Sequence, residues 1–288
     1  MEVLDVIPEI LKKKRIPWGE INIMPIGDIQ YGAEGCDVDR LKRHLKWGVD
    51  HNVWFIGMGD YHDFLSPSNR RILKTSGLYD TAQNLIEQWY GEHLLELQSI
   101  LEPTKDRWLG MLSGHHYFEF SDGTTTDTRL CQFLNTNFLG TCGYLTLTFE
   151  DHAKHVATCK IWCHHGTGSG SNASSALNKL EKIAGGFDAH IYLMGHQSKL
   201  GYAPLDYLDI VKGKDGEPML IDRTKALVAT GSFMRGYQAG SRLGGTGRPS
   251  GSYVEQAMMT PAALGGSLIT VTPRRKDTYT EIDIKVSM

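Results

Sequence analysis

Five short polar motifs carry the residues of this chain that are suited to chemistry. Each motif follows an apolar run and has a glycine next to at least one of its polar residues. In chain order the motifs supply Asp28 and Gln30, Asp60, His115 and His116, His164 and His165, and His196. Carboxylate and imidazole groups are the ligands that suit zinc, manganese and iron, and one aspartate can be shared between two cations. The set therefore predicts a metal site assembled from distant parts of the chain.

A structural role is the simpler interpretation for any one of these residues taken alone. Asp60, for example, is also a good helix N-cap after its strand. The repetition favours the metal site, because five separate placements share the same context of a strand end and a glycine. Glycine lets the backbone turn sharply there, so that a short side chain can point into a cleft.

The apolar runs before the motifs predict the strands that position them. Residues 21–26 and 53–56 are typical of buried strands and flank a helical pattern. Such a βαβ unit has a right-handed crossover and parallel strands. Asp28 and Asp60 are therefore expected at the same edge of the sheet, where open α/β sheets bind their ligands.

The rest of the chain continues this alternation and then changes to β structure. A long amphipathic helix is expected over 80–101, with one face formed by Leu85, Trp89, Leu94 and Leu95. Further strands are expected at 108–112, in two runs over 144–163, and at 190–194. Beyond residue 199 the pattern predicts hairpins over about 205–230 and 267–286. We expect one domain over residues 1–288.

The composition argues against several classes of protein. With 30 basic and 33 acidic residues the formal charge is −3, so no global basic field favours nucleic acid. The five cysteines are odd in number and include no CxxC pair, which disfavours a disulfide framework or a cysteine zinc site. A reduced, cytoplasmic setting is therefore expected. No apolar stretch approaches the length of a membrane span, so no membrane partner is expected.

The ordered motifs resemble those of the calcineurin-like metallophosphoesterase family. The family pattern runs DxH, GD, GNH followed by Asp or Glu, then His, then GHxH, and this chain has GDIQ, GD, GHHY, HHG and GHQS. The resemblance covers about residues 21–199. It implies a four-layer αββα sandwich with mixed sheets and an active site at the C-terminal strand ends. The strands of residues 200–288 would complete the second sheet and contribute a lid.

The resemblance also implies two divalent cations, Mn²⁺, Fe²⁺ or Zn²⁺, with a bridging hydroxide that attacks phosphorus in line. It assigns Asp28 to one metal and Asp60 to a bridge between both. Gln30 stands where the family has a histidine, and its carbonyl oxygen is a neutral ligand. The second metal would be held by Asp60 together with His115, His164 and His196. His165 is expected next to these ligands rather than among them.

Catalytic roles carry over to the GHHY motif. His116 matches the histidine that stabilises charge or protonates the leaving oxygen. His115 would lie near the phosphate as well as on the metal. Tyr117 replaces the acidic residue that usually follows, and Ser198 replaces the last histidine of the family pattern. The first site is therefore expected to bind its metal more weakly than the second.

Several further residues are candidates to support the site or bind substrate. His62 and Asp63 follow Asp60 closely and could orient a ligand. Arg70 and Arg71 lie in the next loop and could bind phosphate through paired hydrogen bonds, although a solvated loop is the simpler interpretation. A glycine-rich stretch near the C-terminus is a candidate lid through Arg235, Tyr237, Arg242 and Arg248.

The leading hypothesis is metal-dependent hydrolysis of a phosphoester, with a phosphodiester favoured over a monoester. A histidine on the leaving-group side suits the poor alkoxide leaving group of a diester. One alternative is a nuclease acting on DNA or RNA, which needs a basic track for the polymer. The other is a degenerate module that binds metal without catalysis, which the departures at Gln30, His115 and Ser198 suggest. The expected partner is a phosphorylated small molecule or a nucleic acid, and a homo-oligomer is left open.

Overall fold

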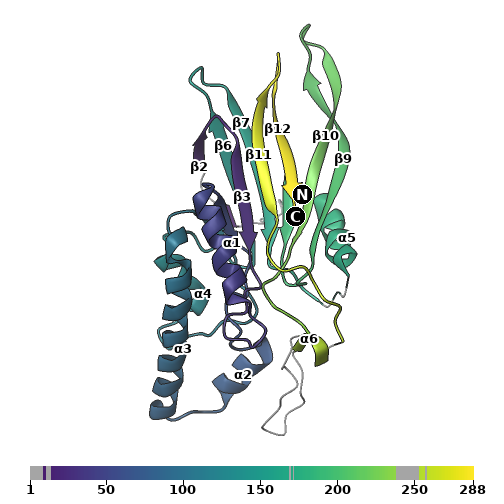
Figure 1. Ribbon diagram of the computed structural model, residues 1–288. Helices are drawn as coiled ribbons and strands as arrows, with labels where there is room; N and C mark the ends of the chain where they lie inside the picture. The colour runs from purple at the N-terminus through teal and green to yellow at the C-terminus, as the bar shows by residue number, and fades with distance from the viewer. Residues whose placement is uncertain (1–8, 11–13, 169, 171, 238–252, 257) are drawn as a thin grey trace, which may run out of the picture.

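Two mixed β-sheets pack face to face and are covered by helices on their outer sides (Figure 1). The structure is a computed structural model that describes residues 9–10, 14–168, 170, 172–237, 253–256 and 258–288. The layers run α, β, β, α, as the four-layer sandwich predicts. Within the part of the chain that the structure describes, no helix is both long and apolar enough to cross a membrane.

The first sheet has five strands and holds the first three motifs at its edge. Its strands, in spatial order, are β12 (Thr280–Ser287), β11 (Leu268–Arg275), β3 (Ile21–Ile26), β4 (Trp54–Gly57) and β5 (Trp108–Met111). Strands β3, β4 and β5 are parallel, so their C-terminal ends lie side by side. The expected βαβ unit is present, with α1 (Val38–Asp50) as its crossover.

The second sheet supplies the last two motifs. Its strands, in spatial order, are β1 (Glu9–Ile10), β6 (Cys142–Glu150), β7 (Val156–His164), β8 (Ile191–Met194), β10 (Pro218–Thr230) and β9 (Leu200–Lys212), and β2 (Lys14–Pro17) also pairs with β6. Strands β7, β8 and β10 are parallel. Their C-terminal ends face those of the first sheet.

The late strands divide between the two sheets instead of all completing the second one. Strands β9 and β10 extend the second sheet beyond β8, whereas β11 and β12 join the first sheet beside β3. Strand β11 joins the first sheet because its apolar residues are buried there. Ile269 and Val271 on β11 have 1% and 0% of their surface exposed and pack in the apolar layer between the sheets.

Helices cover the outer faces unequally. The first sheet packs against α1, against α3 (Asp80–Leu101) with the short 3-10 turn Glu102–Thr104 that follows it, and against α4 (Thr126–Phe133). The second sheet packs against α5 (Ala173–Ala184). Two further helices, α2 (Pro67–Thr75) and α6 (Tyr253–Gln256), lie near the end of the molecule where the motifs converge (Figure 1).

The buried face of α3 differs from the predicted one. Leu85, Trp89 and Leu95 are 68%, 51% and 63% exposed. The buried residues are Leu94, Leu97 and Leu101, which recur at helical spacing in the C-terminal half alone. The helix is longer than the sheet face that it covers, so its first half extends past the core and its apolar residues there stay exposed.

Candidate metal centre and active site

The strand ends of both sheets bring the motifs together in unusual backbone conformations. The residues there with positive φ include Asp28 (46°), Gln30 (53°), Asp60 (52°), His196 (66°) and Ser198 (50°). Left-handed conformations are uncommon for residues other than glycine and cluster at functional sites. The glycines allow close approach: a Cβ added to Gly59 would lie 2.5 Å from the Nδ1 of His165.

Four side chains form a group with metal-ligand geometry. One ligand atom from each lies within 4.8 Å of the others, and the members are Asp60, His115, His165 and His196. One carboxylate and three imidazoles suit a borderline divalent cation such as zinc, manganese or iron. The group joins β4 and β5 of one sheet to β7 and β8 of the other.

The tautomer of His165 supports a ligand role. Its Nδ1 lies 2.7 Å from the carbonyl oxygen of Met58, to which it can donate. Its Nε2 is buried without a hydrogen-bond partner and lies 3.4 Å from Oδ2 of Asp60. A histidine that donates one ring N–H to a carbonyl presents the other nitrogen to a metal. Burial lowers the pKa of His165, but the adjacent Asp60 outweighs burial and raises it to about 9, so a bound cation would take the place of the proton on Nε2.

Asp60 is the most heavily bonded residue of the site. Its Oδ1 accepts the backbone N–H groups of His115 and His116, the latter at 3.1 Å. Its Oδ2 accepts the side-chain amide of Gln30 at 3.1 Å. Burial alone raises the pKa of this carboxyl. In the metal-free chain the adjacent His165 ring and the backbone bond from His115 outweigh burial and lower the pKa. Asp60 is therefore held as a carboxylate.

The structure brings His165 into the group and leaves His164 outside it. The Nδ1 of His164 accepts the backbone N–H of Gly166 at 2.7 Å, and its ring stacks on Trp162 at 5.8 Å between centroids. His165 and His164 occupy opposite faces of the strand that ends there. The ligand position that the resemblance gave to His164 is filled in space by His165.

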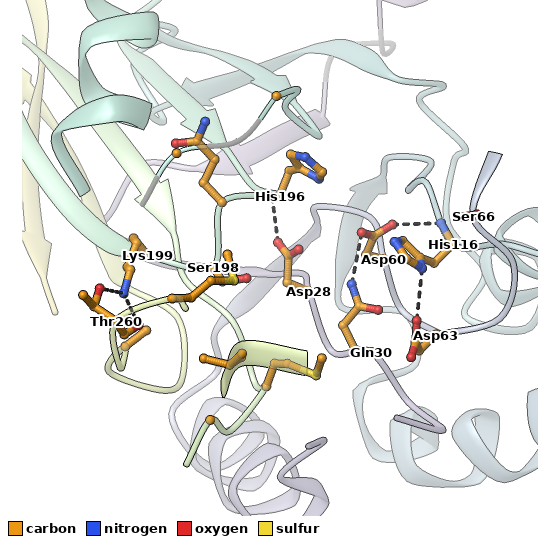
Figure 2. A pocket seen from close by; sticks show the side chains of 18 residues that line it. Asp28, Gln30, Asp60, Asp63, Ser66, His116, His196, Ser198, Lys199 and Thr260 are labelled. Carbon is orange, nitrogen blue, oxygen red and sulfur yellow. Dashed lines mark hydrogen bonds and ion pairs between the residues drawn. The ribbon is translucent and has the colours of Figure 1, made fainter. Parts of the chain in front are cut away.

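The residues expected to bind the first metal, Asp28, Gln30 and Ser198, lie beside this group (Figure 2). Asp28 is 1% exposed, and its Oδ2 accepts the backbone N–H of His196 at 2.7 Å. Burial raises the pKa of its carboxyl to about 7. The Oε1 of Gln30 is buried without a hydrogen-bond partner, as expected for an oxygen that can serve as a ligand. Ser198 lines the same cavity.

His116 has the environment of a proton donor. Its Nδ1 lies 3.0 Å from Oδ1 of Asp63, and this hydrogen bond raises the pKa of the imidazole. Both side chains line the cavity (Figure 2). His62, by contrast, is 1% exposed and stacks on Phe64, and burial lowers its pKa to about 3. It packs as a neutral ring behind the site.

Arg70 and Arg71, predicted to lie in a loop, lie on helix α2, and their roles differ. The guanidinium of Arg70 donates to the carbonyl oxygens of Leu65 and His115 at 2.6 Å and of Tyr117 at 3.1 Å, and it lies over the Tyr117 ring. It is therefore occupied in holding the His115 loop. Arg71 is exposed and is not among the described residues that line the cavity.

The candidate lid is partly outside the described residues, since Arg242 and Arg248 fall there. Arg235 forms an ion pair with Asp37 at 2.6 Å. The hydroxyl of Tyr237 donates to the carbonyl oxygen of Met259. Both side chains thus bind other parts of the chain.

A cavity of about 550 Å³ lies in front of the metal-ligand group. One wall holds the polar site residues, and an opposite wall is formed by Met234, Val254, Met259 and Ala262. The ammonium of Lys199 donates to Thr260 and Pro261, which fixes this second wall against the site.

Two buried residues of the site were not predicted. Asp127 accepts the backbone N–H of Gly114 at 3.0 Å, and burial raises the pKa of its carboxyl to about 6. Gln197 is 4% exposed, lines the cavity and has no partner for its amide. Asp127 stands at a helix start, where capping is the ordinary explanation, and the sequence holds no other signal for either residue.

Comparisons with known proteins give structural likenesses only. No protein-family model matches the chain, and no curated protein matches it. Vps29 from Cryptosporidium parvum is 12% identical, with 94% of this chain and 98% of that one covered and a TM-score of 0.35. A predicted phosphoesterase from Streptococcus pneumoniae is 14% identical, with 92% and 88% covered and a TM-score of 0.34. GAP50 of Plasmodium is 11% identical, with 93% and 84% covered and a TM-score of 0.39.

The chain's own architecture defines its class more directly. An αββα sandwich places the motifs, in the order Asp28 to His196, at facing strand ends around an aspartate and histidine cluster. This is the four-layer arrangement that the resemblance to the calcineurin-like metallophosphoesterase family implies.

Proposed function

We propose that this protein hydrolyses a phosphoester, preferably a phosphodiester, with the help of bound divalent metal. The observation that carries the proposal is the convergence of Asp60 with three imidazoles beside a cavity that Asp60 and His196 line. Side chains from four strand ends meet there although they are far apart in sequence. Packing alone does not call for so many polar groups at one point.

Four residues would hold the main metal ion: Asp60, His115, His165 and His196. When bound, a divalent cation supplies Lewis-acid stabilisation of phosphoryl oxygens and a nucleophile at neutral pH. Zinc, manganese and iron all suit this donor set. The weaker metal site, called the first site above, would be formed by Asp28, Gln30 and Ser198, since two of these three offer only neutral oxygens.

His116 would act on the leaving group. The bond from its Nδ1 to Asp63 keeps the imidazole protonated to higher pH and fixes its orientation. A protonated Nε2 facing the cavity can donate to the departing oxygen, which matters most for an alkoxide. This is why a diester is the preferred substrate.

A small phosphodiester fits better than a polymer. Lys199 is the only lysine or arginine among the described residues that line the cavity, and its ammonium is bonded to Thr260 and Pro261. A nuclease needs a basic track along the backbone of its substrate. Nicking and mobility-shift assays on single-stranded and duplex DNA and RNA test the polymer alternative.

Hydrolysis of bis-p-nitrophenyl phosphate in the presence of Mn²⁺ tests the main proposal. We expect turnover by the wild type and none by Asp60→Asn, which keeps the shape but removes the charge. His152→Asn, on an exposed residue, is the matched control and should retain activity. Equal inactivity of the wild type with Mn²⁺, Zn²⁺, Mg²⁺ and Fe²⁺ would overturn catalysis.

A metal-binding module without catalysis is the second candidate. Two departures from the family pattern favour it. Gln30 stands in place of a histidine and its amide donates to Asp60, and Ser198 offers a hydroxyl in place of the last histidine. Native mass spectrometry separates the two: two cations per chain support the enzyme, and a single one with no turnover supports the module.

A further inference from the structure

The outer part of the β9–β10 hairpin carries an exposed apolar strip. Leu208 and Ile210 on β9 are 70% and 68% exposed, and Leu220 on β10, which pairs directly with Ile210, is 64% exposed. The hairpin extends past the neighbouring strands at the end opposite the metal-ligand group (Figure 1). Among the described strands, β9 pairs with β10 alone and is therefore a sheet edge. Long apolar edges are sites of strand pairing between chains.

The backbone groups of β9 that face away from β10 belong to its even-numbered residues. The N–H of Gly213 bonds to the carbonyl of Glu217 on the β10 side of the turn. Because antiparallel residues alternate between bonded and non-bonded pairs, the backbone of Lys212, Ile210 and Leu208 then faces away from β10. The N–H of Ile210 agrees with this, since its partner is the side chain of Asp209 at 2.9 Å.

The even-numbered residues along this edge are self-complementary. The even-numbered residues read Asp206, Leu208, Ile210 and Lys212, and all four are exposed. A second β9, antiparallel about a two-fold axis through Asp209, places Asp206 opposite Lys212 and Leu208 opposite Ile210. Both pairs occur twice in a two-fold interface. Opposite charges and apolar residues directly across from one another stabilise antiparallel pairing.

We infer that this protein forms a homodimer by antiparallel pairing of β9 with β9 of a second copy. The two second sheets join into one continuous sheet, and the strip of Leu208, Ile210 and Leu220 meets its copy on one face. The two Asp209 side chains meet at the axis, where the ion pair of each with Arg223 at 2.7 Å offsets their like charge. The bond from the N–H of Ile210 to Oδ1 of Asp209 is replaced by a bond to a backbone carbonyl of the partner. The Lys212 carbonyl keeps its bond from the Thr278 hydroxyl, because an oxygen accepts two.

Charge reversal tests the register. In analytical ultracentrifugation of the full chain, we expect the wild type at twice the 32.1 kDa chain mass. Asp206→Lys and Lys212→Asp each place like charges across the axis and should weaken the dimer at least tenfold. The double variant restores opposite charges and should recover most of the affinity. Asp215→Lys, an exposed reversal in the turn, is the matched control.

Cysteine substitution tests the axis itself. Residue 209 meets its own copy as a non-bonded pair, at a Cα separation that a disulfide spans. Asp209→Cys should form a covalent dimer with oxidised glutathione, and Val211→Cys should not, because it faces residue 207 of the copy. If the wild type stays monomeric at all concentrations, the Asp209 side chain blocks strand pairing and the inference is wrong. A dimer that is indifferent to these variants also overturns the inference.

Discussion

At the scale of single residues, the orientation of two adjacent histidines decides which one reaches Asp60. Ala157, Cys159, Ile161 and Cys163 alternate along β7 and pack between the sheets. His165 continues this series, whereas His164 lies on the face of Trp162, which packs against α5. The period of two along the strand thus points His165 toward the metal-ligand group.

The paired variants His165→Asn and His164→Asn test this difference. Loss of a residue that only orients a metal ligand lowers metal affinity by roughly 10- to 100-fold. We expect His165→Asn to lower Mn²⁺ affinity by more than this. The second should leave the affinity nearly unchanged. Calorimetric titration with Mn²⁺ measures both, and the reverse order would return the ligand role to His164.

A second residue-scale prediction concerns the weak metal site. Ser198 has a φ of 50°, a region in which histidine is enriched among non-glycine residues. Ser198→His should therefore fit the backbone and add an imidazole beside Asp28. We expect this variant to keep two ions per chain at lower Mn²⁺ concentrations than the wild type does, while Ser198→Ala should not gain this. Mass spectrometry under native conditions provides the count.

At the scale of elements, α4 fixes the turn that presents His115 and His116. Asp127 lies in its first turn and accepts the N–H of Gly114 and the hydroxyl of Ser113. Asp127→Ala leaves that buried N–H without a partner, which costs about 1–3 kcal/mol of unfolding free energy. It should also lower metal affinity about 10- to 100-fold through the displaced turn.

The conservative variant separates positioning from charge at this position. Asp127→Asn keeps an acceptor oxygen and should recover most of the metal affinity in the same titration. If both variants lost stability but bound Mn²⁺ like the wild type, α4 would support the fold without positioning the site.

The strands and most helices could be predicted because their signals are local. Periodicity predicted the βαβ unit and the long α3, and the resemblance of the motifs to the family implied the sandwich. The buried face of α3 could not be predicted, because it depends on how far the sheet extends beneath Leu85 and Trp89. Asp127 and Gln197 could not be predicted either, since their roles arise from contacts between distant segments.

At the scale of the whole molecule, buried neutral histidines link stability to pH. The Nδ1 of His190, at the start of β8, accepts the N–H of Lys160 on β7 at 2.9 Å. Burial lowers the pKa of His190 to about 4, and it does the same for His44 on α1. The unfolded chain, with histidine pKa values near 6.5, binds these protons first as the pH falls.

The stability that these two histidines contribute should therefore be complete above about pH 6.5 and decline as the pH falls toward 4. Protonation linked to each of these two histidines should lower the unfolding free energy by about 1–2 kcal/mol as the pH falls from 7 to 5. Urea unfolding at both values, in EDTA so that metal binding does not contribute, measures the loss. His190→Gln should reduce the pH dependence by that amount, and His152→Gln, at an exposed position, should not. An unchanged pH dependence in His190→Gln would show that the pKa of His190 is not lowered in the folded protein and would contradict the prediction.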